Sequence, residues 1–171
     1  MRWIVYLQNW RFVMVSYSGY QKIDLDVNGF IHQVIIKPNE TLLRVLREKI
    51  GYTGPKGGCE NGDCGACTVL INSKPMKSCL LLAIECIGKS ITTIEGLNDT
   101  EIQNAFVDFN GFQCGYCTSG FLINAYAMLE ANPDIDEEGK KVWLDANLCR
   151  CTAYDGIKDA VKAAQVEIKK R

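Results

Sequence analysis

GGCENGDCGACTVLINSKPMKSC, residues 57–79, decides the fold of this 171-residue chain. Its cysteines follow the spacing C-x4-C-x2-C, with an eleven-residue gap before the last one. This is the plant-type spacing of a [2Fe–2S] cluster, in which four thiolates hold two irons. The stretch therefore predicts an electron carrier whose iron ligands are Cys59, Cys64, Cys67 and Cys79.

The glycines of this stretch fit the same interpretation. A chain that wraps a compact cluster needs close backbone approach and inward N–H groups, which glycine permits. Zinc is the alternative, because C-x2-C pairs also hold zinc. Structural zinc usually takes two short pairs separated by a longer loop, whereas here three cysteines share one glycine-rich loop. The spacing favours an iron–sulfur cluster.

Composition narrows the class of protein. A net charge of −1 and the lack of a basic cluster argue against a nucleic acid partner. Nine cysteines, an odd number gathered in ligand-like groups, favour metal over disulfides. No apolar run approaches the roughly 20 residues of a spanning helix. We therefore expect a soluble, cytoplasmic chain with no membrane partner.

Residues 1–20 are expected to form an N-terminal extension. Met1–Leu7 and Trp10–Val15 are apolar stretches, but Gln8 interrupts them and no small-residue cleavage site follows. A signal peptide is therefore a weak interpretation. An extension that packs on a partner, or a start codon assigned too early with Met14 as the true beginning, both remain open.

Residues 21–96 are expected to form a β-grasp, plant-type ferredoxin-like domain. Alternating apolar residues around Asn28-Gly29 predict a hairpin. Thr41 is placed to cap a helix through Ile50, with Gly51 after its end. Beyond the cysteine loop we expect the following elements: a strand at 68–71, a turn at 72–75, a short helix at 79–87 and a strand at 90–94.

Residues 97–171 are expected to form an all-α domain, which makes the whole chain α+β. Strand signals disappear after Gly96, and the apolar periodicity predicts a small four-helix bundle. The expected helices begin at Asp99 or Thr100 and run to about Phe109, and then cover 119–131, 136–147 and 155–169.

A second group of cysteines lies in this helical region. Cys114 and Cys117 precede the second predicted helix, and Cys149 and Cys151 precede the fourth. The positive ends of two helices would then face one anionic centre, which favours a thiolate-ligated cluster. Two short pairs also suit tetrahedral zinc, although C-x-C is an uncommon zinc spacing. Together with the plant-type loop, a chain with two clusters explains the cysteines better.

Both cysteine groups occur in motifs that resemble the small iron–sulfur subunits of the xanthine oxidase family, the molybdenum hydroxylases. The resemblance covers about residues 21–165, and the joint occurrence of both groups in this order is specific. The motifs that carry it are GCENGDCGACT at 58–68, TTIEG at 92–96, QCGYCT at 113–118 and NLCRCT at 147–152.

The resemblance implies a subunit with two [2Fe–2S] clusters and no catalytic residue of its own. A large subunit would bind molybdopterin cytosine dinucleotide and oxidise the substrate, and a medium subunit would bind FAD. Electrons would pass from molybdenum to the C-terminal cluster, then to the N-terminal cluster and then to FAD. By the same resemblance, Gln113 contacts the pterin and Cys151 lies close to it.

Two positions depart from the family pattern. The family usually has proline where this chain has Ser119, and glycine where it has Ala153. Serine is acceptable at a helix start and alanine needs only ordinary backbone angles, so neither residue affects ligation.

Among the remaining candidates, Cys86 is expected to be a buried free thiol and His32 a surface or core residue.

Three functions compete at this point. The first is the electron-transfer subunit of a heterotrimeric molybdenum hydroxylase, for which we expect an aldehyde substrate, because heterotrimers with separate small subunits often act on aldehydes; carbon monoxide, purines and N-heterocycles are the alternative substrates. The second is a free-standing two-cluster ferredoxin, which the near-zero charge disfavours, because diffusing ferredoxins use charge for steering. The third is a structural module with one cluster and one zinc.

Overall fold

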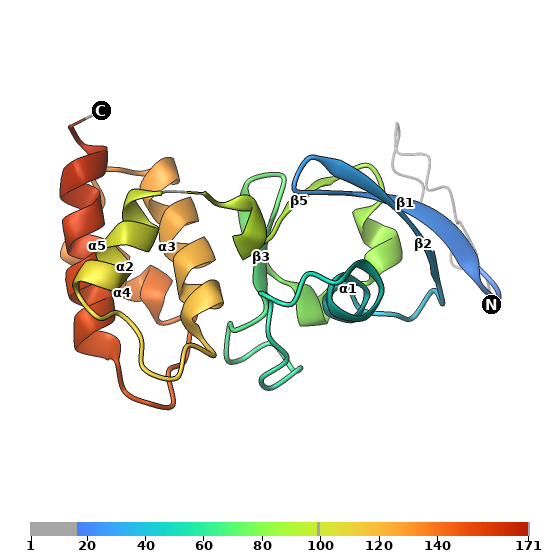
Figure 1. Cartoon of the computed structure of the whole chain (residues 1–171), viewed down its shortest axis with the longest axis horizontal. Coiled ribbons are helices and arrows are strands. Elements are labelled where there is room, and N and C mark those ends of the chain that lie inside the picture. The colour runs from blue at the N-terminus through green and yellow to red at the C-terminus, as the bar shows by residue number, and fades with distance from the viewer. Residues whose placement is uncertain (1–16, 99, 171) are drawn as a thin grey trace, which may run out of the picture.

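The computed structural model describes residues 17–98 and 100–170, which fall into a sheet-containing half and a helical half (Figure 1). The α+β prediction is therefore confirmed. The predicted extension lies outside the described residues except for 17–20, and so does Asp99. The sheet has the strand order β2-β1-β5-β3-β4. Its strands are β1 (Gln21–Val27), β2 (Phe30–Ile36), β3 (Thr68–Ile71), β4 (Lys74–Lys77) and β5 (Ser90–Thr92).

The first hairpin forms as predicted. β1 and β2 pair antiparallel, and Val27 lies opposite Phe30. Asn28 and Gly29 both have positive φ, 56° and 81°, which is the two-residue turn that matches the twist of a hairpin. β1 also pairs in parallel with β5, so the first and last strands of this half lie side by side.

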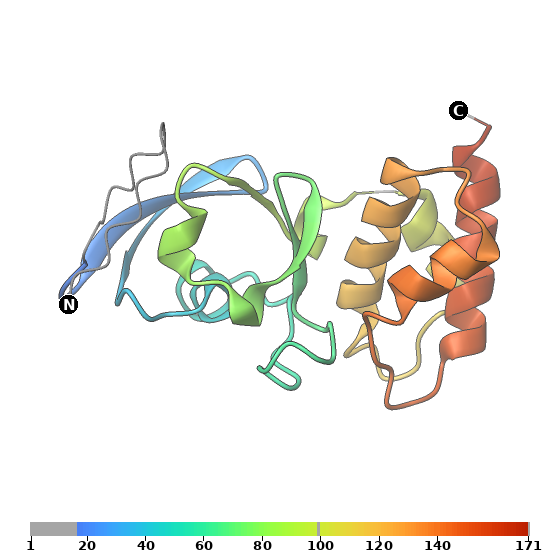
Figure 2. The same cartoon turned by 180° about the vertical axis from the view of Figure 1, so that it is seen from behind.

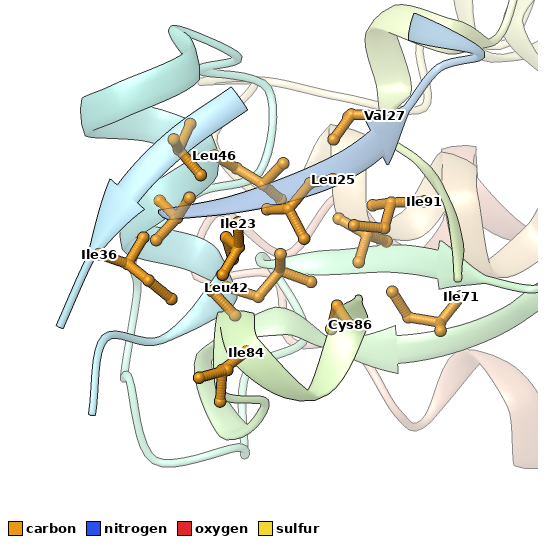
Figure 3. Packing of buried hydrophobic residues seen from close by; sticks show 14 residues of the cluster. Ile23, Leu25, Val27, Ile36, Leu42, Leu46, Ile71, Ile84, Cys86 and Ile91 are labelled. Carbon is orange, nitrogen blue, oxygen red and sulfur yellow. The ribbon is translucent and has the colours of Figure 1, made fainter. Parts of the chain in front are cut away.

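A helix of the first half packs into the core beside β1. α1 (Leu42–Arg44) begins at Thr41, whose hydroxyl accepts a hydrogen bond from the Arg44 N–H. It continues as the π-helical turn η1 (Val45–Ile50) and ends at Gly51, which has a φ of 95°. Figure 3 shows apolar side chains of β1, the helix and the segment around Cys86 meeting in one core.

Two local predictions in this half are wrong. Only Asn72 and Ser73 form the turn, both with positive φ, and β4 begins at Lys74. β4 accepts Pro75 because it is an edge strand, where a missing N–H breaks no ladder. The helix expected at 79–87 is two 3-10 turns, η2 (Ser78–Leu80) and η3 (Ala83–Cys86), separated by extended residues.

The helical half has the four predicted α-helices. Thr100 caps the first of them through a capping box with Gln103. The expected strand at 90–94 is shorter than predicted, because Ile94–Gly96 forms the 3-10 turn η4 before the chain crosses to the helices. The helices are α2 (Glu101–Asp108), α3 (Thr118–Ala131), α4 (Glu137–Leu144) and α5 (Tyr154–Ile168).

α3 joins the two halves. It lies between the other helices and β3 in both views (Figures 1 and 2). Leu70 of β3 packs with Ile123 and Ala127 of α3 in a small core of their own. The same views place the loop at 57–67 and the loops before α3 and α5 at one edge of the molecule. No helix among the described residues is both long and apolar enough to cross a membrane.

Candidate iron–sulfur sites

The structure brings the four cysteines of the first set together as two pairs. Cys59 and Cys64 form an outer pair, because the Cys64 N–H donates to the Cys59 Sγ at 3.3 Å. Cys67 and Cys79 are both buried and form an inner pair, whose thiols interact with each other. The charge of Cys59 also raises the pKa of Cys79, which shows that the two pairs lie close enough to form one site.

Small side chains are needed where this loop closes. A Cβ added at Gly58 would lie 2.8 Å from the Cys64 Sγ, so any larger residue there would fill the space that the thiol occupies. A side chain also holds the backbone at the inner pair: the Ser78 hydroxyl donates a hydrogen bond to the Cys67 carbonyl at 2.7 Å. The backbone of this loop therefore leaves room for the thiols and is held in that conformation by hydrogen bonds.

Backbone donors and burial give the thiols of this set different charge states. The Cys64 N–H is the main reason that the pKa of Cys59 falls to about 6. Burial is the main reason that the pKa of Cys79 rises to about 12, and the neighbouring Cys67 thiol adds to it. Such inward N–H groups are also the donors that would hydrogen-bond the sulfurs of a cluster.

The second set also consists of two pairs. The thiols of Cys114 and Cys151 hydrogen-bond each other, and so do those of Cys117 and Cys149. Cys117 is the N-cap residue of α3. The Ala153 N–H, at the start of α5, donates to the Cys149 Sγ at 3.4 Å. The two cysteine pairs therefore lie at the starts of α3 and α5, as the sequence predicts.

The pKa shifts in the second set follow the same order as in the first. The pKa of Cys114 is lowered, chiefly by the backbone N–H of Tyr116, and the pKa of Cys151 is raised by its hydrogen bond with Cys114. Burial raises the pKa of Cys117 to about 12, and the Cys149 thiol adds to it.

In both sets the thiols are arranged as two pairs. A [2Fe–2S] cluster takes two thiolates on each of its two irons, which matches thiols arranged as pairs. The donor set therefore fits a binuclear iron cluster.

The two sets touch through the segment before Cys149. The Leu148 N–H donates to the Cys64 carbonyl at 2.9 Å. The buried Asn147 side chain donates to the Gly65 carbonyl at 3.0 Å. Asn147 and Leu148 belong to the NLCRCT motif, but no role could be predicted for them, because only the fold brings them to a loop more than eighty residues earlier.

Two further bonds tie the start of α3 and the loop before it to the residues just ahead of Cys59. The Tyr116 hydroxyl donates to the Gly57 carbonyl at 2.8 Å. The Ser119 hydroxyl, where the family pattern has proline, donates to the Gly54 carbonyl at 2.7 Å. Gln113 lies on the exposed part of the same loop, next to the exposed Cys114.

The remaining candidates take no part in either set. Cys86 is buried and free, as predicted, and burial raises its pKa. His32 is half-buried, with its ring edge-on to Tyr52 at 5.6 Å between centroids.

Two family models match this chain. Residues 25–83 match a 2Fe-2S iron-sulfur cluster binding domain, and residues 93–162 match a [2Fe-2S] binding domain. The chain belongs to the small [2Fe–2S] subunits of the molybdenum hydroxylases. This small subunit therefore carries two [2Fe–2S] cluster domains and transfers electrons.

Its relatives act on different substrates. The small subunit is 45% identical to the nicotine 6-hydroxylase small subunit of Paenarthrobacter nicotinovorans, over 90% of this chain and 94% of that one. It is 39% identical to the aldehyde oxidoreductase iron-sulfur-binding subunit of Escherichia coli strain K12, over 86% and 72%. Quinoline 2-oxidoreductase from Pseudomonas putida 86 has the same fold, with a TM-score of 0.83 and 38% identity over 90% of this chain and 98% of that one.

Proposed function

We propose that this small subunit relays electrons between two partner subunits through two [2Fe–2S] clusters. The ligands would be Cys59, Cys64, Cys67 and Cys79 for the first cluster, and Cys114, Cys117, Cys149 and Cys151 for the second. The observation that carries the proposal is the arrangement of each set as two thiol pairs, with the two sets in direct backbone contact. When bound, the clusters supply one-electron redox chemistry, and the chain holds them at a fixed separation.

We further propose the direction of transfer. A large subunit with molybdopterin cytosine dinucleotide would deliver electrons to the C-terminal set, with Gln113 and Cys151 on the side of the pterin. The exposure of Gln113 and Cys114 supports this, because a partner can reach them. A medium subunit with FAD would receive electrons from the N-terminal set, whose outer cysteine, Cys59, is also exposed.

The domain boundary belongs to the same proposal. We place an N-terminal extension at 1–20, the ferredoxin-type domain at 21–96 and the helical domain at 97–171. The two large cores support this division, since one draws its residues from 23–91 and the other from 102–164. We also propose a cytoplasmic location, because all nine cysteines lie in the described part of the chain and all are free.

For the whole complex we propose oxidation of an aldehyde to a carboxylic acid, which the E. coli relative supports. An N-heterocycle is the second candidate, and the higher identity to the nicotine 6-hydroxylase subunit favours it. An assay of the natively purified complex with both substrate classes and an artificial electron acceptor decides between them. Turnover of aldehydes alone supports the first candidate, and turnover of N-heterocycles alone overturns it.

Metal analysis tests the relay itself. The natively purified protein should contain about four irons, about four acid-labile sulfides and no stoichiometric zinc per chain. The reduced sample should give two distinct EPR signals. About two irons with one zinc would limit electron transfer to the N-terminal set and contradict the proposal. Recovery without partner subunits would instead support the free-standing ferredoxin.

A further inference from the structure

A lysine lies against the loop of the first cysteine set. Lys77, the last residue of β4, donates from Nζ to the Gly62 carbonyl at 2.5 Å and to the Asp63 carbonyl at 3.3 Å. Both carbonyls lie between Cys59 and Cys64 in the chain. In the part of the chain that the structure describes, no carboxylate forms an ion pair with Lys77. The ammonium group therefore interacts with the backbone of the cysteine loop instead of a carboxylate.

The peptide groups that Lys77 binds direct their N–H ends at a cysteine. The first of them ends in the Asp63 N–H and the second in the Cys64 N–H. The Cys64 N–H donates to the Cys59 Sγ at 3.3 Å. The Asp63 N–H also donates to the Cys59 thiol, and it is shared with Asn61 Oδ1 at 3.4 Å. Because the carbonyl and the N–H of a trans peptide point in opposite directions, Lys77 and Cys59 lie at opposite ends of both peptide groups.

The sheet fixes the place of this lysine. In the register of β3 and β4, Lys77 lies opposite Thr68, which directly follows Cys67. The next residue is Ser78, whose hydroxyl donates to the Cys67 carbonyl, and Cys79 follows it. The backbone at Lys77 is thus held next to the inner cysteine pair, while its half-buried side chain reaches the outer part of the loop.

A second lysine near this loop binds the backbone without a connection to a thiol. Lys56 is also half-buried, and its Nζ donates to the Thr53 carbonyl. That peptide group ends in the Gly54 N–H, which donates to Glu95 Oε1 at 2.7 Å. Lys56 therefore has the same charge and the same kind of bond as Lys77, but its peptide group leads to a carboxylate.

Two carboxylates of the cysteine loop oppose the charge of Lys77. Glu60 and Asp63 are both exposed, so water and salt screen their charges. The ammonium group of Lys77 is instead bound to the backbone of the loop on a half-buried side chain. Its effect on the first cysteine set should therefore exceed theirs.

We propose that Lys77 is a positioning residue for the cluster of the first set and raises its midpoint potential. Its charge polarises the two peptide groups and holds their N–H groups on Cys59. One-electron reduction converts one ferric iron to ferrous iron and adds one negative charge, and no covalent bond forms or breaks. A nearby cation and N–H donors stabilise this reduced state.

The inference rests on the proposed function, because it requires a cluster at each set. A raised potential at the first set would favour electron transfer in the proposed direction, from the C-terminal set to the N-terminal set.

Three variants separate the charge of Lys77 from its structural role. Lys77→Met keeps most of the side-chain length but removes the charge and the donor. Lys77→Arg keeps both. Lys56→Met is the matched control, because it removes the same charge and a similar backbone bond that leads to no thiol.

The experiment is a redox titration of the natively purified protein with dithionite, followed by EPR, with iron content measured alongside. The signal that vanishes in Cys67→Ser identifies the first cluster. In Lys77→Met the equilibrium constant for reducing this cluster should fall about tenfold, which is about 59 mV for a one-electron couple. The second cluster should keep its potential. Lys77→Arg should stay close to the wild type, and Lys56→Met should shift the first cluster clearly less.

The outcomes separate the inference from the function on which it rests. A wild-type protein without two clusters would refute the proposed function. Full iron with an unchanged first potential in Lys77→Met would refute the inference alone, and so would an equal fall in Lys56→Met or at both clusters. If Lys77→Met loses the first cluster, Lys77→Gln, which keeps a neutral donor, must show the fall. Loss of that cluster in both would also overturn the inference, because the lysine would then serve cluster assembly.

Discussion

In each cysteine set, the pKa of one exposed outer thiol is lowered and the pKa of one inner thiol is raised. Backbone N–H groups lower the pKa of Cys59 and of Cys114, both of which are exposed. Burial raises the pKa of Cys79 and of Cys117. Cys59 and Cys114 therefore lose their protons more readily than the inner thiols, and every thiol must be deprotonated when it binds iron.

Alkylation of the cluster-free protein should depend on pH in a residue-specific way. Because the pKa of Cys59 falls to about 6, its reactive thiolate should appear as the pH rises through about 6. Any stability that this thiolate contributes is correspondingly lost as the pH falls through the same value. Cys86 should stay unreactive at neutral pH, because burial raises its pKa. Iodoacetamide labelling read by peptide mass spectrometry checks both, and equal labelling at pH 7 would contradict the assignment.

Removal of one inner ligand should empty one site only. Cys67→Ser takes a thiol from the first set, so iron should fall from about four to about two per chain, and one EPR signal should vanish. Cys86→Ser is the control, since it changes a buried thiol that belongs to neither set and should keep all the iron. Full iron content in Cys67→Ser would remove this residue from the ligand set.

At the scale of elements, α3 does more than contribute to the helical bundle. Its N-cap is Cys117, its first turn carries Ser119 and Gly120, and its apolar face packs on β3. One helix thus connects a cysteine pair, the loop of the other set and the sheet. A shift of α3 would therefore alter both sites together.

Gly120→Ala should destabilise the protein although it improves helix propensity. The gain in propensity is about 1 kcal/mol, but the new Cβ would lie 2.2 Å from the Gly65 carbonyl oxygen, which is backbone and cannot move aside. We expect a net loss of about 1–3 kcal/mol in the free energy of unfolding. Gly139→Ala in α4 is the comparison and should cost less, because there the nearest atoms belong to side chains, Cγ1 of Ile135 at 2.7 Å and Oδ1 of Asp136 at 3.0 Å, and not to backbone. Denaturant unfolding measures both, and equal stability of the two variants would exclude the clash.

Local signals predicted most of these elements. Asn28-Gly29 and Thr100 act on their immediate neighbours, so the hairpin and the start of α2 were visible in the sequence. The helix predicted from the apolar run at 79–87 is wrong, because periodicity alone does not distinguish an α-helix from 3-10 turns that pack against a core. The ligand sets were visible in their spacing, whereas the role of Asn147 depends on packing across the fold.

At the scale of the molecule, each half of the described chain has a large apolar core, one packed against the sheet and one among the helices. A small core that includes Leu70 and Ile123 lies between the halves. Because the shared core is apolar and the cysteine loops are also bonded across it, the halves should unfold together.

Ile123→Ala should break this cooperativity. Ile123 is fully buried between the halves, so its truncation costs about 2–5 kcal/mol and weakens their contact. Ile102→Ala is the matched control, because Ile102 is equally buried but lies within the helical core. Calorimetry should show two separated transitions for Ile123→Ala and one lowered transition for Ile102→Ala. A single transition in both would mean that other contacts carry the coupling.

The seam between the halves also contains a natural optical reporter. Trp143 packs against the shared core, and its carbonyl accepts the hydrogen bond from Asn124. The other two tryptophans, Trp3 and Trp10, lie in the first sixteen residues. A chain that begins at Tyr17 would therefore fluoresce from this one indole. Iron centres quench nearby fluorescence, so the emission intensity of Trp143 should rise when the clusters are lost. It should also change when the two halves separate, and no added label is needed.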